Sequence, residues 1–160
     1  METDHRMLEE KLSSLQKDRL ELVTHSPEET IELGEHLARR LPRPCLVILE
    51  GDLGSGKTTL VKGIVAGLGV ARQEEVTSPS FTLVHEYGKD NKVYHVDLYR
   101  IEGLREQGTL GLEELLEQDA MVIVEWGEKL IDLEVGVQVR IRMELLDGED
   151  RRITIEGLGK

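Results

Sequence analysis

The chain of 160 residues carries 20 basic and 32 acidic side chains, giving a formal net charge of −12 at pH 7, and 39% of its residues are hydrophobic. This length predicts a single domain with a hydrophobic core, and no apolar run approaches the roughly 20 residues that a membrane-spanning helix needs. A surface this acidic argues against direct, tight binding to a nucleic-acid backbone. Any role in nucleic-acid chemistry is therefore expected to work through protein partners.

Two features bear on the cellular setting. The single cysteine, Cys45, cannot form an internal disulfide, and residues 1–8 lack the basic-then-apolar order of a signal peptide. Both predict a reducing, cytoplasmic setting without a membrane anchor, in which Cys45 is a small buried side chain.

The first 22 residues are rich in charge. Leu8, Leu12 and Leu15 recur at helical spacing and form a narrow apolar stripe. The pattern predicts a helical extension of uncertain role over residues 1–22, followed by the main domain at residues 23–160. A weakly attached helix and a docking helix for a partner both remain open.

A better-defined helix is predicted next. Ser26 is a good N-cap, Pro27 suits the first helical position, and Glu29 completes a capping box. Gly34 lies inside this helix and lowers its propensity by about 1 kcal/mol relative to alanine, which indicates a close packing contact at that point.

The stretch Gly51-Asp-Leu-Gly-Ser-Gly-Lys-Thr58 matches the phosphate-binding P-loop pattern G-x-x-x-x-G-K-[ST]. It lies between an apolar strand at residues 46–49 and a helical pattern at residues 58–69, which is the context that the motif requires. Backbone N–H groups of such a loop converge on phosphates, the lysine reaches the β- and γ-phosphates, and the Thr58 hydroxyl binds Mg²⁺. The residues expected to contact a nucleotide are Asp52, Leu53, Gly54, Ser55, Gly56, Lys57, Thr58 and Thr59.

The rest of the chain alternates strands with turn residues and one helical segment. An α/β fold with one P-loop NTPase-like domain follows, with a mixed parallel and antiparallel sheet, flanking helices and hairpin insertions. In chain order the predicted elements are a hairpin of residues 81–87 and 92–98, a helix at 102–118, a strand at 121–124, and a second hairpin of 135–145 and 151–155.

Two acids, Asp97 and Glu125, follow apolar strands. Parallel strands point their carboxyl ends towards the ligand crevice, so acids at these positions would face the phosphates. One carboxylate would hold Mg²⁺ while the other orients a nucleophile, although both could be ordinary strand-end residues. Which of the two contacts the metal is open.

Other polar and aromatic residues are weaker candidates. Thr77 and Ser80 lie in a segment that either senses the γ-phosphate as a switch or forms a turn whose hydroxyls satisfy their own backbone. His95 shares a strand face with Asp97 and is expected to be structural, with orientation of that acid as one such role. Trp126, the only tryptophan, could cover the nucleotide, contact a partner or be buried in the core.

The nucleotide base is inferred from missing patterns. GTPases read guanine with N-K-x-D, but Asn91-Lys-Val-Tyr94 ends without the aspartate, and Asp97-Leu-Tyr-Arg100 departs from D-x-x-G. The sequence therefore favours adenine, with ATP and Mg²⁺ as the cofactors.

Four motifs, taken in order and at their spacings, resemble the TsaE (YjeE) family. They are Gly51–Thr59, Thr77–Thr82, His95–Arg100 and Val124–Trp126. This family comprises bacterial ATPases required for threonylcarbamoyladenosine (t6A) modification of tRNA, and the resemblance covers roughly residues 26–156. The first 20 or so residues are an extension that many relatives lack.

The resemblance implies a slow ATPase that acts in a complex with TsaD and TsaB and meets tRNA only indirectly, its ATP turnover resetting the machinery. It assigns Thr58 and Glu125 to Mg²⁺ and makes Asp97 necessary for hydrolysis, so the expected catalytic residues are Lys57, Asp97 and Glu125. It also implies that Pro27 and Arg151 contact the nucleotide from the two ends of the chain, and that Trp126 lies beside the site.

Two rival functions share the P-loop. A small-molecule or nucleoside kinase would need an acceptor pocket and an arginine-rich lid, and no such lid is evident in the sequence. A nucleotide-binding switch would signal by conformation without meaningful hydrolysis. Phosphoacceptor screening tests the first, and phosphate release with and without partners tests the second.

Overall fold

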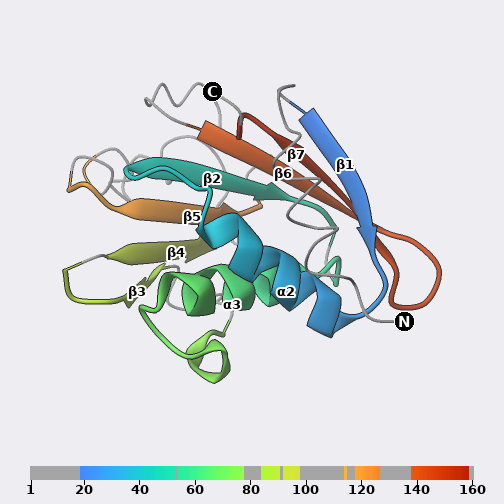
Figure 1. Ribbon diagram of the computed structural model, residues 1–160, viewed down its shortest axis with the longest axis horizontal. Helices are drawn as coiled ribbons and strands as arrows, with labels where there is room; N and C mark the ends of the chain where they lie inside the picture. The colour runs from blue at the N-terminus through green and yellow to red at the C-terminus, as the bar shows by residue number, and fades with distance from the viewer. Residues whose placement is uncertain are drawn as a thin grey trace.

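The computed structural model describes residues 19–52, 54–77, 84–90, 92–97, 114, 118–126 and 138–158. Its described strands form one seven-stranded sheet, and two helices lie side by side against one face of it (Figure 1). The elements are β1 (Arg19–Thr24), α2 (Pro27–Ala38), β2 (Cys45–Glu50), α3 (Lys57–Leu68), the short 3₁₀ helix η1 (Gln73–Glu75), β3 (Val84–Tyr87), β4 (Val93–Asp97), β5 (Met121–Glu125), β6 (Gln138–Leu145) and β7 (Arg151–Glu156).

The strand order is β1-β7-β6-β2-β5-β4-β3. The four central strands β6, β2, β5 and β4 are parallel, whereas β3, β7 and β1 each pair antiparallel with their neighbours. The predicted α/β class with a mixed sheet is confirmed. Because β2, β4 and β5 are parallel, their carboxyl ends lie at one edge of the sheet, and the loop after β2 meets the ends of the other two there.

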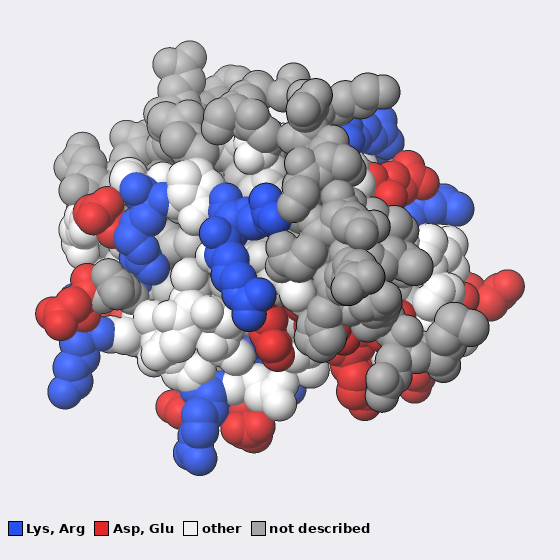
Figure 2. Space-filling view, viewed as in Figure 1, with Lys and Arg blue, Asp and Glu red and all other residues white. Residues whose placement is uncertain are grey.

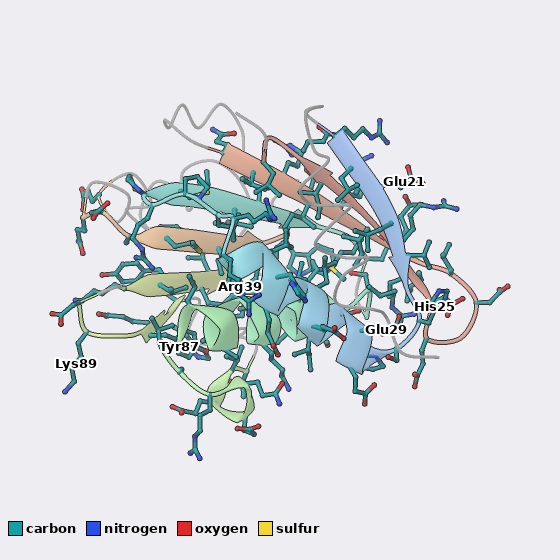
Figure 3. The ribbon with its side chains drawn as sticks, in the orientation of Figure 1. Glu21, His25, Glu29, Arg39, Tyr87 and Lys89 are labelled. Carbon is teal, nitrogen blue, oxygen red and sulfur yellow. The ribbon has the colours of Figure 1, made fainter. Side chains whose placement is uncertain are left out.

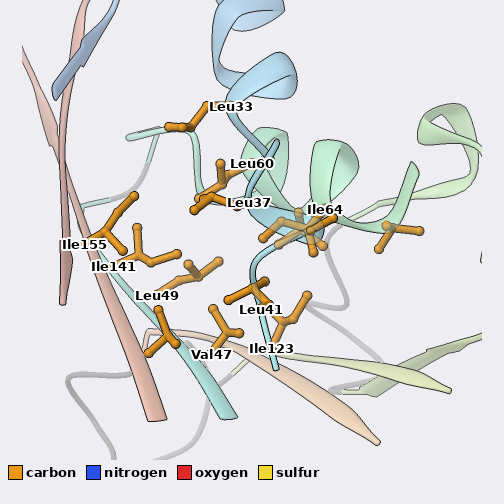
Figure 4. Close-up of a cluster of buried hydrophobic side chains, with 14 of the residues drawn as sticks. Leu33, Leu37, Leu41, Val47, Leu49, Leu60, Ile64, Ile123, Ile141 and Ile155 are labelled. Carbon is orange, nitrogen blue, oxygen red and sulfur yellow. The ribbon is translucent and has the colours of Figure 1, made fainter. Parts of the chain in front are cut away.

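A hydrophobic core fills the space between the sheet and the two helices. Every residue of β2 and β5 is buried, as expected of central parallel strands that are covered on both faces. Burial also raises the pKa of the Cys45 thiol to about 12, which agrees with the predicted inert, buried cysteine. Figure 4 shows side chains of both helices meeting those of the strands, among them Leu33, Leu37, Leu60, Ile64, Val47, Leu49, Ile123 and Ile141.

The start of α2 has the predicted cap. The Glu29 backbone N–H donates to Ser26 Oγ at 3.1 Å, and Pro27 is the first residue of the helix. The Glu29 carboxylate accepts from the His25 N–H at 2.8 Å, one residue further back than in a standard capping box. Figure 3 shows His25 and Glu29 together where β1 gives way to α2.

The two helices approach closely at glycines. A Cβ on Gly34 would lie 2.6 Å from the Leu60 carbonyl oxygen, and one on Gly63 would lie 2.1 Å from the Ile31 carbonyl oxygen. Both distances are shorter than any tolerable contact with backbone. The close contact predicted at Gly34 is therefore present, with Gly63 as its counterpart in α3.

This contact gives a stability prediction. Helix propensity alone favours Gly63→Ala by about 1 kcal/mol, but overpacking a backbone contact costs about 1–3 kcal/mol, so we expect net destabilisation. Ala66→Gly, at a half-buried site of the same helix, should lose about 1 kcal/mol through propensity alone. Urea unfolding measures both changes, and a Gly63→Ala protein more stable than wild type would contradict the packing argument.

Some sequence predictions need correction or lie outside the described residues. The helical extension at residues 1–22 is wrong for residues 19–22, because Arg19–Thr24 is a strand that pairs with β7. Residues 1–18 are not described, so the rest of that extension stays a prediction. Both predicted hairpins are present, as β3–β4 and β6–β7. Most of the helix predicted at 102–118 is also outside the described residues; of the two positions described there, Glu114 is helical and Gln118 lies in a turn.

No helix among the described residues is long and apolar enough to cross a bilayer.

Candidate nucleotide-binding site

The loop between β2 and α3 has the tight backbone that the motif predicts. Gly51 has φ 152°, and a Cβ there would lie 2.6 Å from both the Met143 carbonyl oxygen and Ser55 Oγ. Gly56 is a left-handed N-cap with no side-chain hydrogen bond to the first turn of α3. The first amides of α3 thus have no capping side chain, which is the arrangement in which a helix start accepts an anion.

Lys57 is the first residue of α3, and its side chain reaches back to this loop. It is only 5% exposed, and its Nζ donates to the carbonyl oxygens of Gly51 and, at 3.1 Å, Asp52. The ammonium also lies 3.8 Å from the ring centroid of Trp126, a cation–π contact. The positive charge is thereby held at the bend, where a phosphate chain would follow the backbone.

The two candidate acids are neighbours across the sheet. Asp97 ends β4 and Glu125 ends β5, the two are paired in register, and their exposures are 2% and 3%. Both side chains share the sheet face covered by α3, because Asp97 lies four residues after Val93 and Glu125 two residues after Ile123, and both of those residues belong to the core on that face. The predicted pair of strand-end carboxylates is therefore brought together beneath the P-loop.

Glu125 also contacts the first turn of α3. The Thr58 hydroxyl donates to Glu125 Oε2 at 2.9 Å, with Oε1 at 3.2 Å. A hydroxyl and a carboxylate oxygen are ligands that Mg²⁺ accepts, and this ion completes its shell with phosphates and water rather than with a dedicated protein cage. Among the described residues no group of three His, Cys, Asp or Glu side chains could hold a metal ion by itself.

Trp126 follows Glu125 with a left-handed backbone, φ 64°. Such a conformation is costly for a bulky side chain, and it turns the chain sharply at the end of β5. The Trp126 indole is half-buried and lies against Lys57. It is therefore beside the P-loop and not deep in the core.

The turn between β1 and α2 and the start of β7 lie at the same edge of the sheet as the P-loop. Arg151 begins β7, and its Nη2 lies 3.5 Å from the Gly54 carbonyl oxygen of the loop. The preceding residue, Asp150, contacts His25 Nδ1 at 3.1 Å, just ahead of Pro27. Arg151 therefore lies beside the P-loop. Pro27 is the first residue of α2, which follows β1 at the same edge of the sheet.

The switch candidates are only partly described. Thr77 is exposed, and its backbone hydrogen-bonds the Tyr87 hydroxyl. Burial chiefly raises the pKa of that hydroxyl, and the nearby charges of Glu75 and Glu125 act in the same direction. Ser80 and the loop residue Leu53 lie outside the described residues.

A family model described as "Threonylcarbamoyl adenosine biosynthesis protein TsaE" matches residues 24–153. The chain belongs to the TsaE family. A Treponema pallidum tRNA threonylcarbamoyladenosine biosynthesis protein TsaE is 35% identical to it over 133 residues, covering 83% of this chain and 97% of that protein.

Two further TsaE relatives extend the comparison. The Streptomyces coelicolor protein of the same name is 39% identical over 137 residues, covering 81% of this chain and 90% of its own length. The crystal structure of Bacillus subtilis YdiB superposes with a TM-score of 0.68 at 31% identity, covering 88% of this chain and 86% of that one. The match supports the α/β fold as well as the family.

Some residues beside the candidate nucleotide-binding site of this TsaE chain were not identified from the sequence. Glu50, the last residue of β2, is buried and pairs with Arg140 and, at 3.6 Å, with Arg142 of β6. The signal was the two-residue spacing of the arginines, which puts both on one face of a strand. This cluster borders an open cavity of about 330 Å³ beside the P-loop, lined by Glu50, Gly51, Asp52, Arg142, Met143, Glu144 and Leu145.

Proposed function

We propose that this chain binds ATP with Mg²⁺, hydrolyses it slowly, and thereby serves t6A modification of tRNA together with TsaD and TsaB. Membership of the TsaE family supports the pathway. The observation that carries the chemistry is the contact between the Thr58 hydroxyl and the Glu125 carboxylate, 2.9 Å apart, beside the loop that holds Lys57.

Each residue has a role in this proposal. Lys57 and the amides from Gly54 to Thr59 bind the phosphates, and in doing so Lys57 exchanges the carbonyls of Gly51 and Asp52 for phosphate oxygens. Thr58 and Glu125 hold Mg²⁺, which when bound neutralises charge on the β- and γ-phosphates. Asp97, buried next to Glu125, orients the attacking water.

The remaining predicted residues lie around this centre. Arg151 would contact the nucleotide from beside Gly54, and Pro27 would approach it from the start of α2. Trp126 would limit access of water near Lys57. Thr77 and Ser80 stay candidates for a switch segment.

The charge of the chain favours indirect contact with tRNA. The net charge is −12, and Figure 2 shows basic and acidic side chains interspersed over the described part of the face that carries α2 and α3. The described part of this face offers no continuous basic track for a phosphate backbone. Protein subunits such as TsaD and TsaB are therefore the proposed partners, in a cytoplasmic setting.

Phosphate release tests the proposal. We expect slow Mg²⁺-dependent ATP hydrolysis by the chain alone, since no arginine finger is evident in the sequence, and faster hydrolysis when TsaD and TsaB are added. ATP binding without hydrolysis under any condition would favour a nucleotide switch instead. Phosphate transfer to a screened small-molecule acceptor would favour a kinase.

A further inference from the structure

His95 lies on β4 and contacts Glu125 of the candidate site, and it has no part in the function proposed above. It is fully buried on β4, two residues before Asp97 and on the same sheet face. Its Nε2 contacts Glu125 Oε2, the same carboxylate oxygen that accepts from the Thr58 hydroxyl. Imidazole and hydroxyl therefore approach one oxygen from two elements, β4 and α3.

The chemistry of this contact fixes which group donates. A carboxylate only accepts, so the imidazole donates through Nε2–H. The other nitrogen, Nδ1, is buried and has no hydrogen-bond partner among the described residues. The single polar contact that the described structure gives His95 is thus directed at Glu125.

The imidazole plane is held by a second ring. His85, paired with His95 across the β3–β4 hairpin, lies edge-on to it with centroids 6.4 Å apart and planes at 81°. The His85 ring is in turn edge-on to Tyr87, whose hydroxyl lies 3.5 Å from His85 Nδ1. Packing on the strand side therefore restricts rotation of His95, and its Nε2–H stays aimed at Glu125.

We propose that His95 is a positioning residue for Glu125, fixing Oε2 so that the carboxylate faces Thr58 and the Mg²⁺ of a bound nucleotide. The inference rests on the proposed Mg²⁺–ATP function. Groups that hydrogen-bond a metal-binding carboxylate set its orientation, and removing them commonly lowers metal affinity or activity about 10–100-fold. Without the Nε2–H donor, Glu125 would rotate more freely and bind the metal more weakly.

Two amide substitutions separate positioning from simple burial. The amide nitrogen of glutamine reaches about as far as imidazole Nε2, whereas that of asparagine reaches only as far as Nδ1. Both side chains are smaller than imidazole, so neither overpacks the buried position. His95→Gln keeps a donor near Glu125, and His95→Asn does not.

The measurement is the gain in ATP affinity that Mg²⁺ provides. Fluorescence of Trp126, the only tryptophan, reports ATP binding to the full chain with and without Mg²⁺. We expect His95→Asn to lose about 10-fold or more of this gain while ATP affinity without Mg²⁺ stays unchanged. His95→Gln should retain most of the gain, and the control Glu86→Gln, at an exposed acid of the neighbouring strand β3, should match wild type.

The outcomes are distinct. A full Mg²⁺-dependent gain in His95→Asn, or equal losses in the asparagine and glutamine variants, would overturn the positioning role while the proposed function stands. A wild-type chain whose ATP affinity is indifferent to Mg²⁺ would overturn the proposed function itself.

Discussion

Replacing Lys57 by alanine is expected to abolish ATP binding. The ammonium is the only charge of the described residues that contacts the P-loop carbonyls of both Gly51 and Asp52, and a phosphate chain would take their place. Hydrogen bonds to charged groups contribute about 1.5–3 kcal/mol each, so affinity should fall on the order of 100-fold or more. Isothermal titration calorimetry with ATP and Mg²⁺ measures the change directly.

Two further variants make this result specific. Lys57→Met keeps the aliphatic stem beside Trp126 and removes only the charge, so it should fail as Lys57→Ala does. Lys62→Ala removes a lysine from the same helix, α3, outside the loop, and should bind ATP like wild type. Wild-type ATP affinity in Lys57→Ala would refute the phosphate-binding assignment.

Neutralising either buried acid should stop turnover and leave the fold intact. Asp97→Asn and Glu125→Gln keep the volume of each side chain at 2% and 3% exposure but remove its charge. We expect phosphate release to fall about 10²–10⁴-fold in each case, the range for removing a group that acts on the reacting water or its metal. Thermal unfolding should remain cooperative in both variants.

Binding experiments separate the two acids. Glu125→Gln should also lose the Mg²⁺-dependent gain in ATP affinity, because Glu125 contacts Thr58 and Asp97 is expected to act on water. Asp97→Asn should keep that gain. Glu86→Gln, an exposed acid on β3 that pairs with Lys92 at 2.8 Å, is the matched control and should behave as wild type. Normal hydrolysis in both acid variants would rule out the two-carboxylate mechanism.

The parts of the site that the sequence predicted are encoded locally. The P-loop needs only a strand, a glycine-rich turn and a helix start, which lie within residues 45–68. The acids follow from a simple rule, since any apolar parallel strand of this sheet ends at the same edge. The cap of α2 and the turn between β6 and β7 also depend on residues a few positions apart.

The N-terminal strand shows how a local pattern misled. Leu8, Leu12 and Leu15 suggested a helix through residue 22, but Leu20, Leu22 and Thr24 alternate with exposed residues, as a strand requires. That weak alternation becomes a strand because β7 offers a free edge, with Arg19 opposite Glu156. A partner so far along the chain cannot be read from a short window.

The register of the β3–β4 hairpin was equally undetermined. A turn of residues 88–91 would set Tyr87 opposite Lys92, whereas the structure pairs Tyr87 with Val93 and His85 with His95. A shift of one residue changes which side chains share a face, so the two histidines meet only in the observed register.

By itself the sequence determined which groups this chain carries: a loop expected to bind phosphates, a hydroxyl and two carboxylates expected to act on Mg²⁺ and water, and a net charge of −12 that argues against a nucleic-acid backbone. Only the tertiary structure decided how those groups meet. It set Glu125 against Thr58 and His95, Lys57 against Trp126, and Arg151 beside Gly54. The physical reason is separation along the chain. A motif consists of neighbouring residues, whereas these contacts join distant segments that strand pairing and burial of a common core bring together.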